Sequence, residues 1–134
     1  MKRYFFLSFI IAFFFFLNSQ VFAQTEGEKN NVLVLNTENF DKTIKKGVVL
    51  VDFWAPWCRP CGVQGVIIDE LADSLHNKIK IGKVDTDKNK ALSSRFAIQY
   101  IPTTIIFVDG VAVDKYSGLQ SKEDLLKRLS PYMK

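Results

Sequence analysis

Residues 51–61 decide how this chain folds, and they read Val51-Asp52-Phe53-Trp54-Ala55-Pro56-Trp57-Cys58-Arg59-Pro60-Cys61. The overlapping run Val48–Ala55 is nearly all apolar, as expected for a strand that is buried on both faces. Beyond Pro60, apolar residues recur every four positions, which predicts a long amphipathic helix that ends near His76-Asn77. These apolar residues are Ile67, Leu71 and Leu75. Both cysteines therefore lie where a buried strand passes into a long helix.

Cys58 and Cys61 are the only cysteines of the chain. A thiolate at a helix N-terminus lies against unpaired backbone N–H groups and the positive end of the helix dipole. The pKa of Cys58 should therefore fall, and the thiolate is the reactive form of the side chain. Cys61 lies one turn further along, close enough to form a disulfide but more shielded. Pro60 suits the first helical turn, where its missing N–H has no intrahelical partner to lose.

Two other uses of the cysteine pair stay open at this point. A structural disulfide is one, although a two-residue spacer closes a loop too small to constrain much of the unfolded chain. A zinc site is the other, although it needs about four ligands. The chain offers one histidine and no second cysteine pair. We therefore favour a redox-active dithiol, and we expect no metal and no cofactor.

Strand and helix patterns alternate along the remaining chain in the order βαβαβαββα. Further strands are expected at Val32–Leu35, Lys78–Asp85, Thr103–Val108 and Val111–Tyr116. Further helices are expected after a cap at Asn36 or Thr37, over Asn89–Ala97, and after a capping box that starts at Ser121. Asp109-Gly110 is a strong hairpin signal. The first half requires parallel strands joined by crossovers, and the end is a hairpin plus a helix.

The first 23 residues have the features of an export signal. Lys2 and Arg3 precede an apolar run, Tyr4–Leu17, and Val21-Phe22-Ala23 supplies small residues for cleavage before Gln24. An uncleaved membrane anchor is the alternative, but a spanning helix needs roughly 18 or more apolar residues. We expect residues 1–23 to be a signal peptide, 24–31 a flexible leader and 32–134 the folded domain. The mature protein should then be soluble and periplasmic or secreted.

Composition excludes several classes of function for the mature chain. Without Lys2 and Arg3, 16 basic residues face 14 acidic ones, so the net charge falls from +4 to +2. Lys and Arg never form a block longer than two residues, which does not favour nucleic-acid binding. The length allows one domain, and the remainder is too apolar and too evenly charged to be disordered. We expect a monomer that binds no nucleic acid.

The stretch quoted first closely resembles the active site of the thioredoxin family. The resemblance extends over residues 32–133. It includes Lys83-Val84-Asp85, Ile101-Pro102-Thr103, Asp109-Gly110 and Gly118 at the spacings of the family. It implies a thioredoxin fold, an α/β architecture with a central mixed sheet and helices on both faces. It also implies a protein-disulfide reductase in which Cys58 attacks, Cys61 resolves the mixed disulfide, and the two form a redox-active disulfide.

Asp52 interrupts an apolar run, and an unpaired buried carboxylate is costly, so it needs a partner or a proton. A strand end that faces solvent is the alternative. The resemblance implies that Asp52 lies beneath Cys61 and shuttles its proton, with a pKa raised by burial and Lys83 close by. It also implies a cis Ile101–Pro102 bond that faces the cysteines. Base rates alone would favour trans at Pro102, and an ordinary edge-strand lysine at position 83.

The resemblance also implies a surface for extended substrates. Trp57, Arg59 and Pro60 would lie on one side of it. On the other side, the backbone of Ile101 would be free to pair with a substrate segment. Gly118 matches a groove glycine at which a side chain would block the substrate. His76, at a helix end, is expected to be solvated and to have no catalytic role.

Two positions depart from the pattern of the family. Glycine is usual where Arg59 stands. The added positive charge should favour the thiolate and a more oxidising couple, unless Arg59 is solvated and only selects partners. A proline that kinks the helix is common where Val66 stands, after Gly65. The helix is therefore expected either to bend differently at Gly65 or to be straighter.

Several functions remain to be separated. The favoured one is reduction of disulfides in exported proteins, with a membrane electron-transfer protein as the reductant. A disulfide oxidase or isomerase is one alternative, but a histidine near Pro60 and a helical insertion are both missing. A cytochrome-maturation reductase is another, but the interval from Cys61 to Pro102 is too short for its insertion. A redox-inert interaction module is disfavoured because both cysteines are present.

Overall fold

The computed structural model describes residues 30–134. The expected signal peptide, residues 1–23, lies outside the described residues, as does the expected leader except for Asn30 and Asn31. Within the described part, no helix combines the length and the apolar character needed to cross a membrane.

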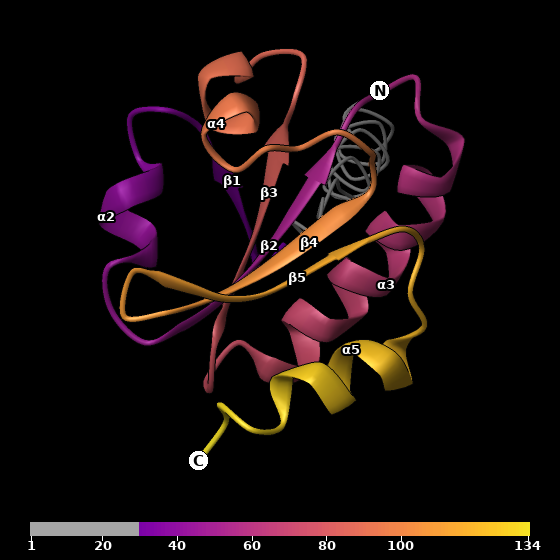
Figure 1. Cartoon of the computed structure of the whole chain (residues 1–134). Coiled ribbons are helices and arrows are strands. Elements are labelled where there is room, and N and C mark those ends of the chain that lie inside the picture. Colours follow the sequence, from indigo (N-terminus) through magenta and orange to yellow (C-terminus); the bar gives the residue numbers. More distant parts are fainter. Residues whose placement is uncertain (1–29) are drawn as a thin grey trace, which may run out of the picture.

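The elements follow the expected order βαβαβαββα (Figure 1). The strands are β1 (Val32–Leu35), β2 (Val48–Trp54), β3 (Lys80–Asp85), β4 (Thr103–Val108) and β5 (Val111–Ser117), and the helices are α2 (Phe40–Ile44), α3 (Arg59–Leu75), α4 (Lys90–Arg95) and α5 (Lys122–Leu129). The strands form one sheet in the order β1-β3-β2-β4-β5. β3 pairs parallel with β1 and β2, whereas β4 pairs antiparallel with β2 and β5. The predicted thioredoxin fold is confirmed.

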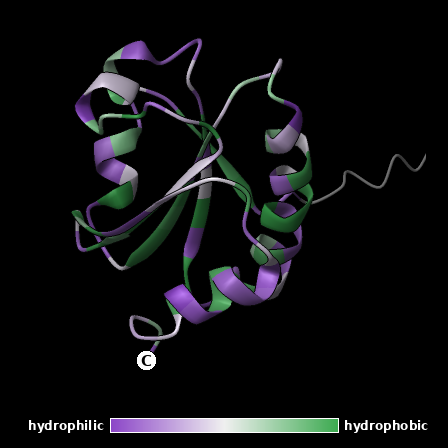
Figure 2. Ribbon diagram, turned by 45° about the vertical axis from the view of Figure 1, so that its right-hand side comes forward, coloured by the Kyte–Doolittle hydropathy of each residue, from purple (hydrophilic) through white to green (hydrophobic). Residues whose placement is uncertain are grey.

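Helices cover both faces of this sheet (Figure 1). α3 and α5 pack on one face, where Leu50 of β2 meets Ile68 and Leu125. α2 and α4 cover the other face, where Val49 and Val51 of the same strand meet a second apolar cluster. Because successive side chains of a strand point to opposite faces, β2 is apolar on both, as its sequence predicts. Figure 2 shows the same arrangement, with hydrophobic residues along the sheet and polar residues on the outer sides of the helices.

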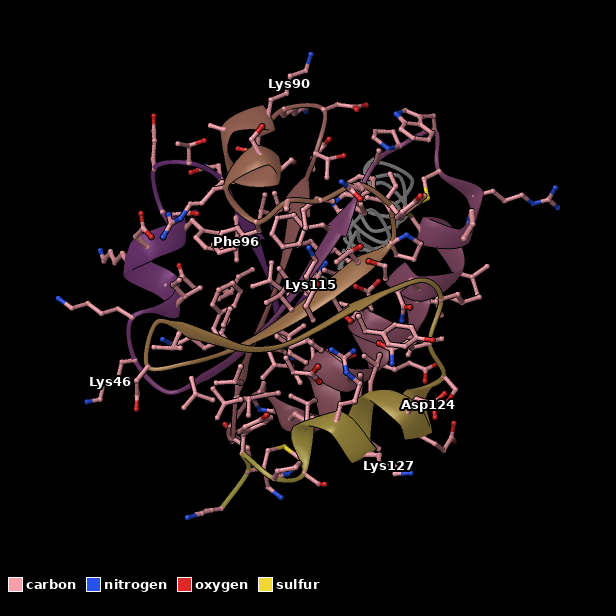
Figure 3. All side chains as sticks on the ribbon, in the orientation of Figure 1. Lys46, Lys90, Phe96, Lys115, Asp124 and Lys127 are labelled. Atoms are coloured by element: carbon pink, nitrogen blue, oxygen red, sulfur yellow. A yellow bond between two sulfur atoms is a disulfide. The ribbon has the colours of Figure 1, made fainter. Side chains whose placement is uncertain are left out.

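Aromatic rings fill the layer beneath α2 and α4. The Phe96 ring centroid lies 5.2 Å from that of Phe40 and 5.3 Å from that of Phe107, the latter pair edge to face (Figure 3). The Lys115 Nζ of β5 donates to the carbonyl oxygens of Phe96 and Ala97 at 2.8 and 2.9 Å. These contacts fix the segment that leads from α4 toward β4.

Element bounds differ from expectation by a residue or more at several places, and three of the differences have a local explanation. β3 begins at Lys80 because the N–H groups of Lys78 and Ile79 still donate to the Leu75 carbonyl at the end of α3. α4 is shorter than predicted and ends before Ala97, which has a left-handed φ of 49°. Asn36 caps the turn that precedes α2, accepting from the N–H of Glu38 and Asn39, whereas the helix itself begins at Phe40.

The hairpin and the last helix agree with their sequence signals. Asp109 and Gly110 have φ values of 48° and 87°, the left-handed conformation that a tight hairpin between β4 and β5 requires. Ser121 is the N-cap of α5, and its Oγ accepts from the N–H of Asp124 at 3.1 Å.

Candidate active site

The two cysteines lie at the junction of β2 and α3. Cys58 is the N-cap residue of α3, with an extended φ/ψ of −85°/106°, and its Sγ accepts from the N–H of Cys61 at 3.3 Å. The two residues form a disulfide, with their Cα atoms 5.3 Å apart. Cys58 is 8% exposed and Cys61 3% exposed. The sulfur at the helix N-terminus is therefore also the one closer to solvent, in a position where a thiolate is favoured.

The segment before β4 faces this disulfide. The Ile101–Pro102 peptide bond is cis, as the resemblance implied. The Ile101 carbonyl oxygen lies 3.7 Å from Cys58 Sγ, and the Ile101 side chain packs on a small cluster formed by Ala55 and the two cysteines. The site therefore has two walls. One is the start of α3 with its cysteines, and the other is the Ile101–Pro102 segment, which is far removed in sequence.

Gly118 lies beside that wall, and its N–H donates to the Pro102 carbonyl at 2.8 Å. A Cβ at position 118 would meet only the Tyr116 ring, at 3.7 Å, which is an ordinary contact. The φ of Gly118 is +115°, a conformation that residues with a side chain rarely adopt. Glycine is therefore required at this position by its backbone conformation rather than by lack of space within the protein.

Asp52 lies in the middle of β2 and is fully buried. Neither of its carboxyl oxygens has a hydrogen-bond partner among the described residues. Burial raises the pKa of Asp52 to about 7, while the Lys83 ammonium lowers that pKa and the Asp69 carboxylate raises it. Asp52 is thus a buried acid that exchanges its proton near neutral pH. The alternative of a solvent-facing strand end is wrong.

Lys83 is the parallel-strand partner of Asp52 in the sheet, but its ammonium bonds elsewhere. The Lys83 Nζ lies 3.3 Å from an Asp69 carboxylate oxygen of α3. Both residues line a hollow of about 200 Å³ that also reaches Asp52 and Cys61. The acid, the lysine and the inner cysteine therefore share one small space. Gly65 borders it, and a Cβ there would come within 3.2 Å of Lys83 Nζ.

The remaining predicted residues lie on the rim. Trp57 is 72% exposed, and Arg59 and Pro60 are exposed at the start of α3. His76 is exposed at the far end of α3, with Nδ1 2.8 Å from the Asp73 carbonyl, so it lies apart from the site. α3 runs as one helix through Val66 (Figure 1).

Sequence reasoning missed two features of the rim. The Trp57 Nε1 donates to Asp87 Oδ2 at 3.0 Å, which fixes the exposed indole. The signal was present, because Asp87 follows β3 and the carboxyl ends of the parallel strands β2 and β3 lie at one edge. Large apolar side chains are also exposed on the segments that frame the disulfide. They are Val63, Val66, Tyr100 and Leu119.

Known proteins resemble this chain in sequence and fold. The profile of the family described as Thioredoxin matches residues 31–131. This chain belongs to the thioredoxin family. It is 41% identical over 102 residues to the thioredoxin of Staphylococcus haemolyticus, covering 76% of this chain and 98% of that protein. It is 39% identical to a Staphylococcus epidermidis thioredoxin with the same coverage. A solved structure of a mutant thioredoxin from Halobacterium salinarum NRC-1 superimposes with a TM-score of 0.72 at 30% identity, covering 78% of this chain and 94% of that one.

Membership of the family and the site agree on the class of chemistry. The chain is a thioredoxin-type disulfide oxidoreductase with a redox-capable Cys58–Cys61 pair. The structural-disulfide and zinc interpretations are therefore set aside in favour of a redox-active disulfide.

Proposed function

We propose that this thioredoxin-family protein reduces disulfide bonds in exported proteins. The observation that carries the proposal is the buried Asp52, whose pKa of about 7 allows it to take a proton at neutral pH. It shares a hollow with Cys61, the less exposed of the two cysteines. A base at that position serves the resolving step, because Cys61 must lose its proton before it attacks.

The reaction then has two exchanges. The Cys58 thiolate attacks one sulfur of the substrate disulfide, so a mixed disulfide forms while the other substrate sulfur leaves as a thiolate and takes up a proton. Cys61, deprotonated by Asp52, attacks the Cys58 sulfur and releases the second substrate thiolate, which is also protonated. Two electrons and two protons pass to the substrate, and the protein is left with the Cys58–Cys61 disulfide. The Lys83 ammonium lowers the pKa of Asp52 in both exchanges.

Substrate docks across the gap between the two walls. The exposed Trp57, Arg59 and Pro60 supply one side. The cis Ile101–Pro102 segment and Gly118 supply the other, and the backbone of Ile101 pairs with an extended substrate strand. In this docking mode a substrate sulfur lies opposite Cys58.

Replacement of single cysteines tests the assignment of roles. Cys58→Ser should abolish reduction of a protein disulfide such as that of insulin, because the attacking sulfur is lost and the remaining Cys61 is buried. Cys61→Ser should still attack and should accumulate a mixed disulfide. Alkylation of the reduced wild type at mildly acidic pH should label Cys58 first. Preferential labelling of Cys61 would reverse the assignment.

The redox potential tests the direction of the reaction. Equilibration with glutathione should give a value near the roughly −270 mV known for thioredoxin, whereas strong oxidases of the superfamily lie near about −120 mV. A value near the second figure would make the protein an oxidase with the same site.

Export follows from the N-terminal sequence, residues 1–23. After cleavage the protein works outside the cytosol, so its dithiol must be restored by a membrane protein that transfers electrons through thiols. Mass spectrometry of the protein from its host should find an N-terminus at or near Gln24 in the soluble fraction. An intact N-terminus in the membrane fraction would show that the segment is an anchor.

A further inference from the structure

Gln64 lies one turn beyond Cys61 on α3, and its side chain is fully buried. The carboxamide makes two hydrogen bonds with the backbone of a single residue, Gln120. Gln64 Oε1 accepts from the Gln120 N–H at 2.8 Å, and Gln64 Nε2 donates to the Gln120 carbonyl at 3.3 Å. A helix side chain therefore holds a distant loop in the way that a neighbouring strand would.

The loop has no substitute for this contact. Gln120 lies outside the helices and strands, and within residues 30–134 its N–H and carbonyl have no hydrogen-bond partner other than Gln64. Because Gln120 is itself buried, loss of the Gln64 carboxamide would leave two backbone groups without partners. The backbone at this point is thus fixed by one side chain of the active-site helix.

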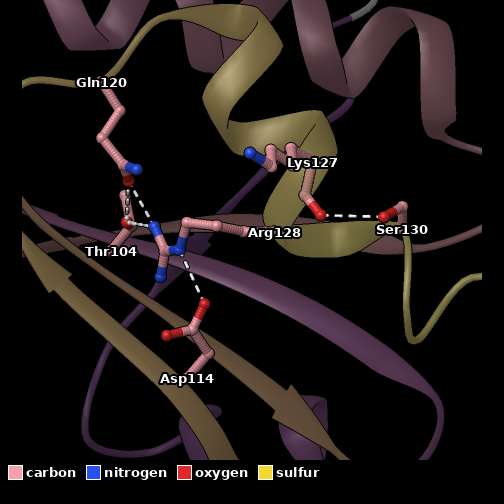
Figure 4. Close-up of polar contacts among 6 residues, drawn as sticks. All are labelled: Thr104, Asp114, Gln120, Lys127, Arg128 and Ser130. Atoms are coloured by element: carbon pink, nitrogen blue, oxygen red, sulfur yellow. Dashed lines mark hydrogen bonds and ion pairs between the residues drawn. The ribbon is translucent and has the colours of Figure 1, made fainter.

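The side chain of Gln120 is anchored as well (Figure 4). Its Oε1 accepts from Thr104 Oγ1 at 3.0 Å and from Arg128 Nη1. Arg128 Nε donates to Asp114 Oδ2 of β5 at 2.7 Å, and Nη1 donates to Thr104 at 2.8 Å. The far end of the loop is therefore connected to β4, β5 and α5, in addition to α3.

The anchored segment belongs to the rim of the site. Gly118 is held at one end by the Pro102 carbonyl, and Gln120 is held at the other end by Gln64. Leu119, between them, is 48% exposed. Without the Gln64 bonds, Gln120 is held only through its own side chain, so its backbone is free to shift and to carry Leu119 away from the gap.

We propose that Gln64 is a positioning residue that sets substrate specificity. By fixing Gly118–Gln120 against α3, it holds Leu119 where an extended polypeptide beside the disulfide must pass. The protein then favours disulfides within a polypeptide over small disulfides, which reach Cys58 without touching this segment. The inference rests on the proposed docking of substrate between the two walls.

Gln64→Met is the decisive variant, because it keeps the length of the side chain and removes both hydrogen bonds. It is made in the Cys61→Ser background, in which each molecule forms one mixed disulfide, so the rate reports attack by Cys58 regardless of net direction. The substrates are a disulfide-linked peptide and 5,5′-dithiobis(2-nitrobenzoate). Ile68→Val, one turn further along α3 and also buried, is the control for a mildly weakened helix.

We expect Gln64→Met to lower the peptide rate about tenfold relative to the small-disulfide rate, as loss of one good docking contact would. Ile68→Val should leave that ratio within about twofold. Amide hydrogen exchange at Gln120 should also accelerate in Gln64→Met. An unchanged ratio, or an equal fall for both substrates, would overturn the inference and leave Gln64 a purely structural residue. If instead the wild type fails to reduce insulin, the proposed function fails, while the ratio still decides the role of Gln64.

Discussion

Two polar regions are buried beneath α3, and they differ in whether their polar groups have hydrogen-bond partners. In one, Cys61 and Gly65 border the hollow of Asp52, whose carboxyl oxygens have no partner among the described residues. In the other, Gln64 bonds the backbone of Gln120, and the Gln120 side chain bonds Thr104 and Arg128. The same helix thus covers an unsatisfied polar site and a largely satisfied one, on neighbouring strands where Asp52 is paired with Thr104.

The difference shows how burial affects a polar group that has hydrogen-bond partners and one that has none. An unpaired carboxyl is destabilised as an anion, so it keeps its proton up to neutral pH and can exchange it during catalysis. A paired amide has no such freedom, because each partner fixes the position of the other. A buried polar side chain is therefore reactive when it lacks hydrogen-bond partners, and it positions its neighbours when it has them.

Asp52→Asn should give the largest change, and it tests the unpaired region. The unfolded pKa is 3.8 and the folded pKa about 7, so the folded state binds more protons between these values. Wild-type stability should therefore fall as pH rises from about 4 to about 7 and then level off. Asn cannot ionise, so the oxidised variant should be more stable than wild type by about 4 kcal/mol at pH 8, with the difference falling below about 1 kcal/mol near pH 4.

Urea denaturation of the oxidised proteins at the two pH values measures this effect. Glu38→Gln, which removes an exposed acid of the α2 region, is the control and should show no such pH dependence. A gain of equal size at both pH values would mean that the charge of Asp52 is not what costs stability.

Arg128→Met tests the paired region. Its side chain is 14% exposed and donates to Asp114, Thr104 and Gln120. Its loss therefore leaves the buried Thr104 and Gln120 and the partly buried Asp114 with fewer donors. We expect a loss of about 2–3 kcal/mol in the free energy of unfolding. The loss should be similar at pH 6 and pH 8, in contrast to the effect at Asp52.

Lys127→Met, the exposed neighbour on α5, supplies the matched control and should change stability by less than about 0.5 kcal/mol. Equal effects of the two variants would show that the network contributes little.

Arg59→Gly tests whether a positive charge outside both regions stabilises the Cys58 thiolate. Arg59 is exposed, so solvent should screen most of its interaction with Cys58. The couple should become more reducing by less than about 30 mV, the equivalent of one pKa unit for two electrons, and the shift should shrink in high salt. Equilibration with glutathione at two salt concentrations measures it. An unchanged potential with altered rates toward particular proteins would assign Arg59 to partner selection.

Asp69→Asn should change stability least, and it tests how neighbouring charges set the pKa of Asp52. The Asp69 carboxylate raises the pKa of Asp52 and also holds the Lys83 ammonium at 3.3 Å. Its removal should lower the pKa of Asp52, both directly and by freeing Lys83 to interact with it. The pH transition in stability should move to lower pH while the network around Arg128 stays unchanged. Movement to higher pH would contradict this arrangement of charges.

Much of the fold and of the reactive site could be predicted because the signals are local. The apolar run of β2 and the four-residue period of α3 placed both cysteines correctly. The interruption of that run marked Asp52 as a residue that needs a partner or a proton, and the family resemblance implied its burial and raised pKa. The hairpin at Asp109-Gly110 and the cap at Ser121 also depend on neighbouring residues alone.

The unpredicted contacts join residues far apart in the chain. Gln64 and Gln120 are 56 positions apart, and a glutamine in an amphipathic helix ordinarily indicates a solvent-facing side. Arg128 likewise resembles an exposed basic residue of the last turn of α5, the usual place for one. Only the packing of α3, β4, β5 and α5 around a common point reveals that these polar side chains are buried together.

The strand order has a consequence for a chain that is synthesised from its N-terminus. Within residues 30–134, β2, the middle strand, pairs with residues 80–85 and 103–108 alone, and β1 pairs with β3 alone. Both cysteines are therefore synthesised before any strand that pairs with β2 or β1. The Ile101–Pro102 segment and Gly118, which border the site, are synthesised later still. A nascent chain that stops before β4 has both thiols but lacks the antiparallel partner of β2 and the cis Ile101–Pro102 segment that faces Cys58. The site around the two cysteines is therefore complete only when the final third of the chain has been added.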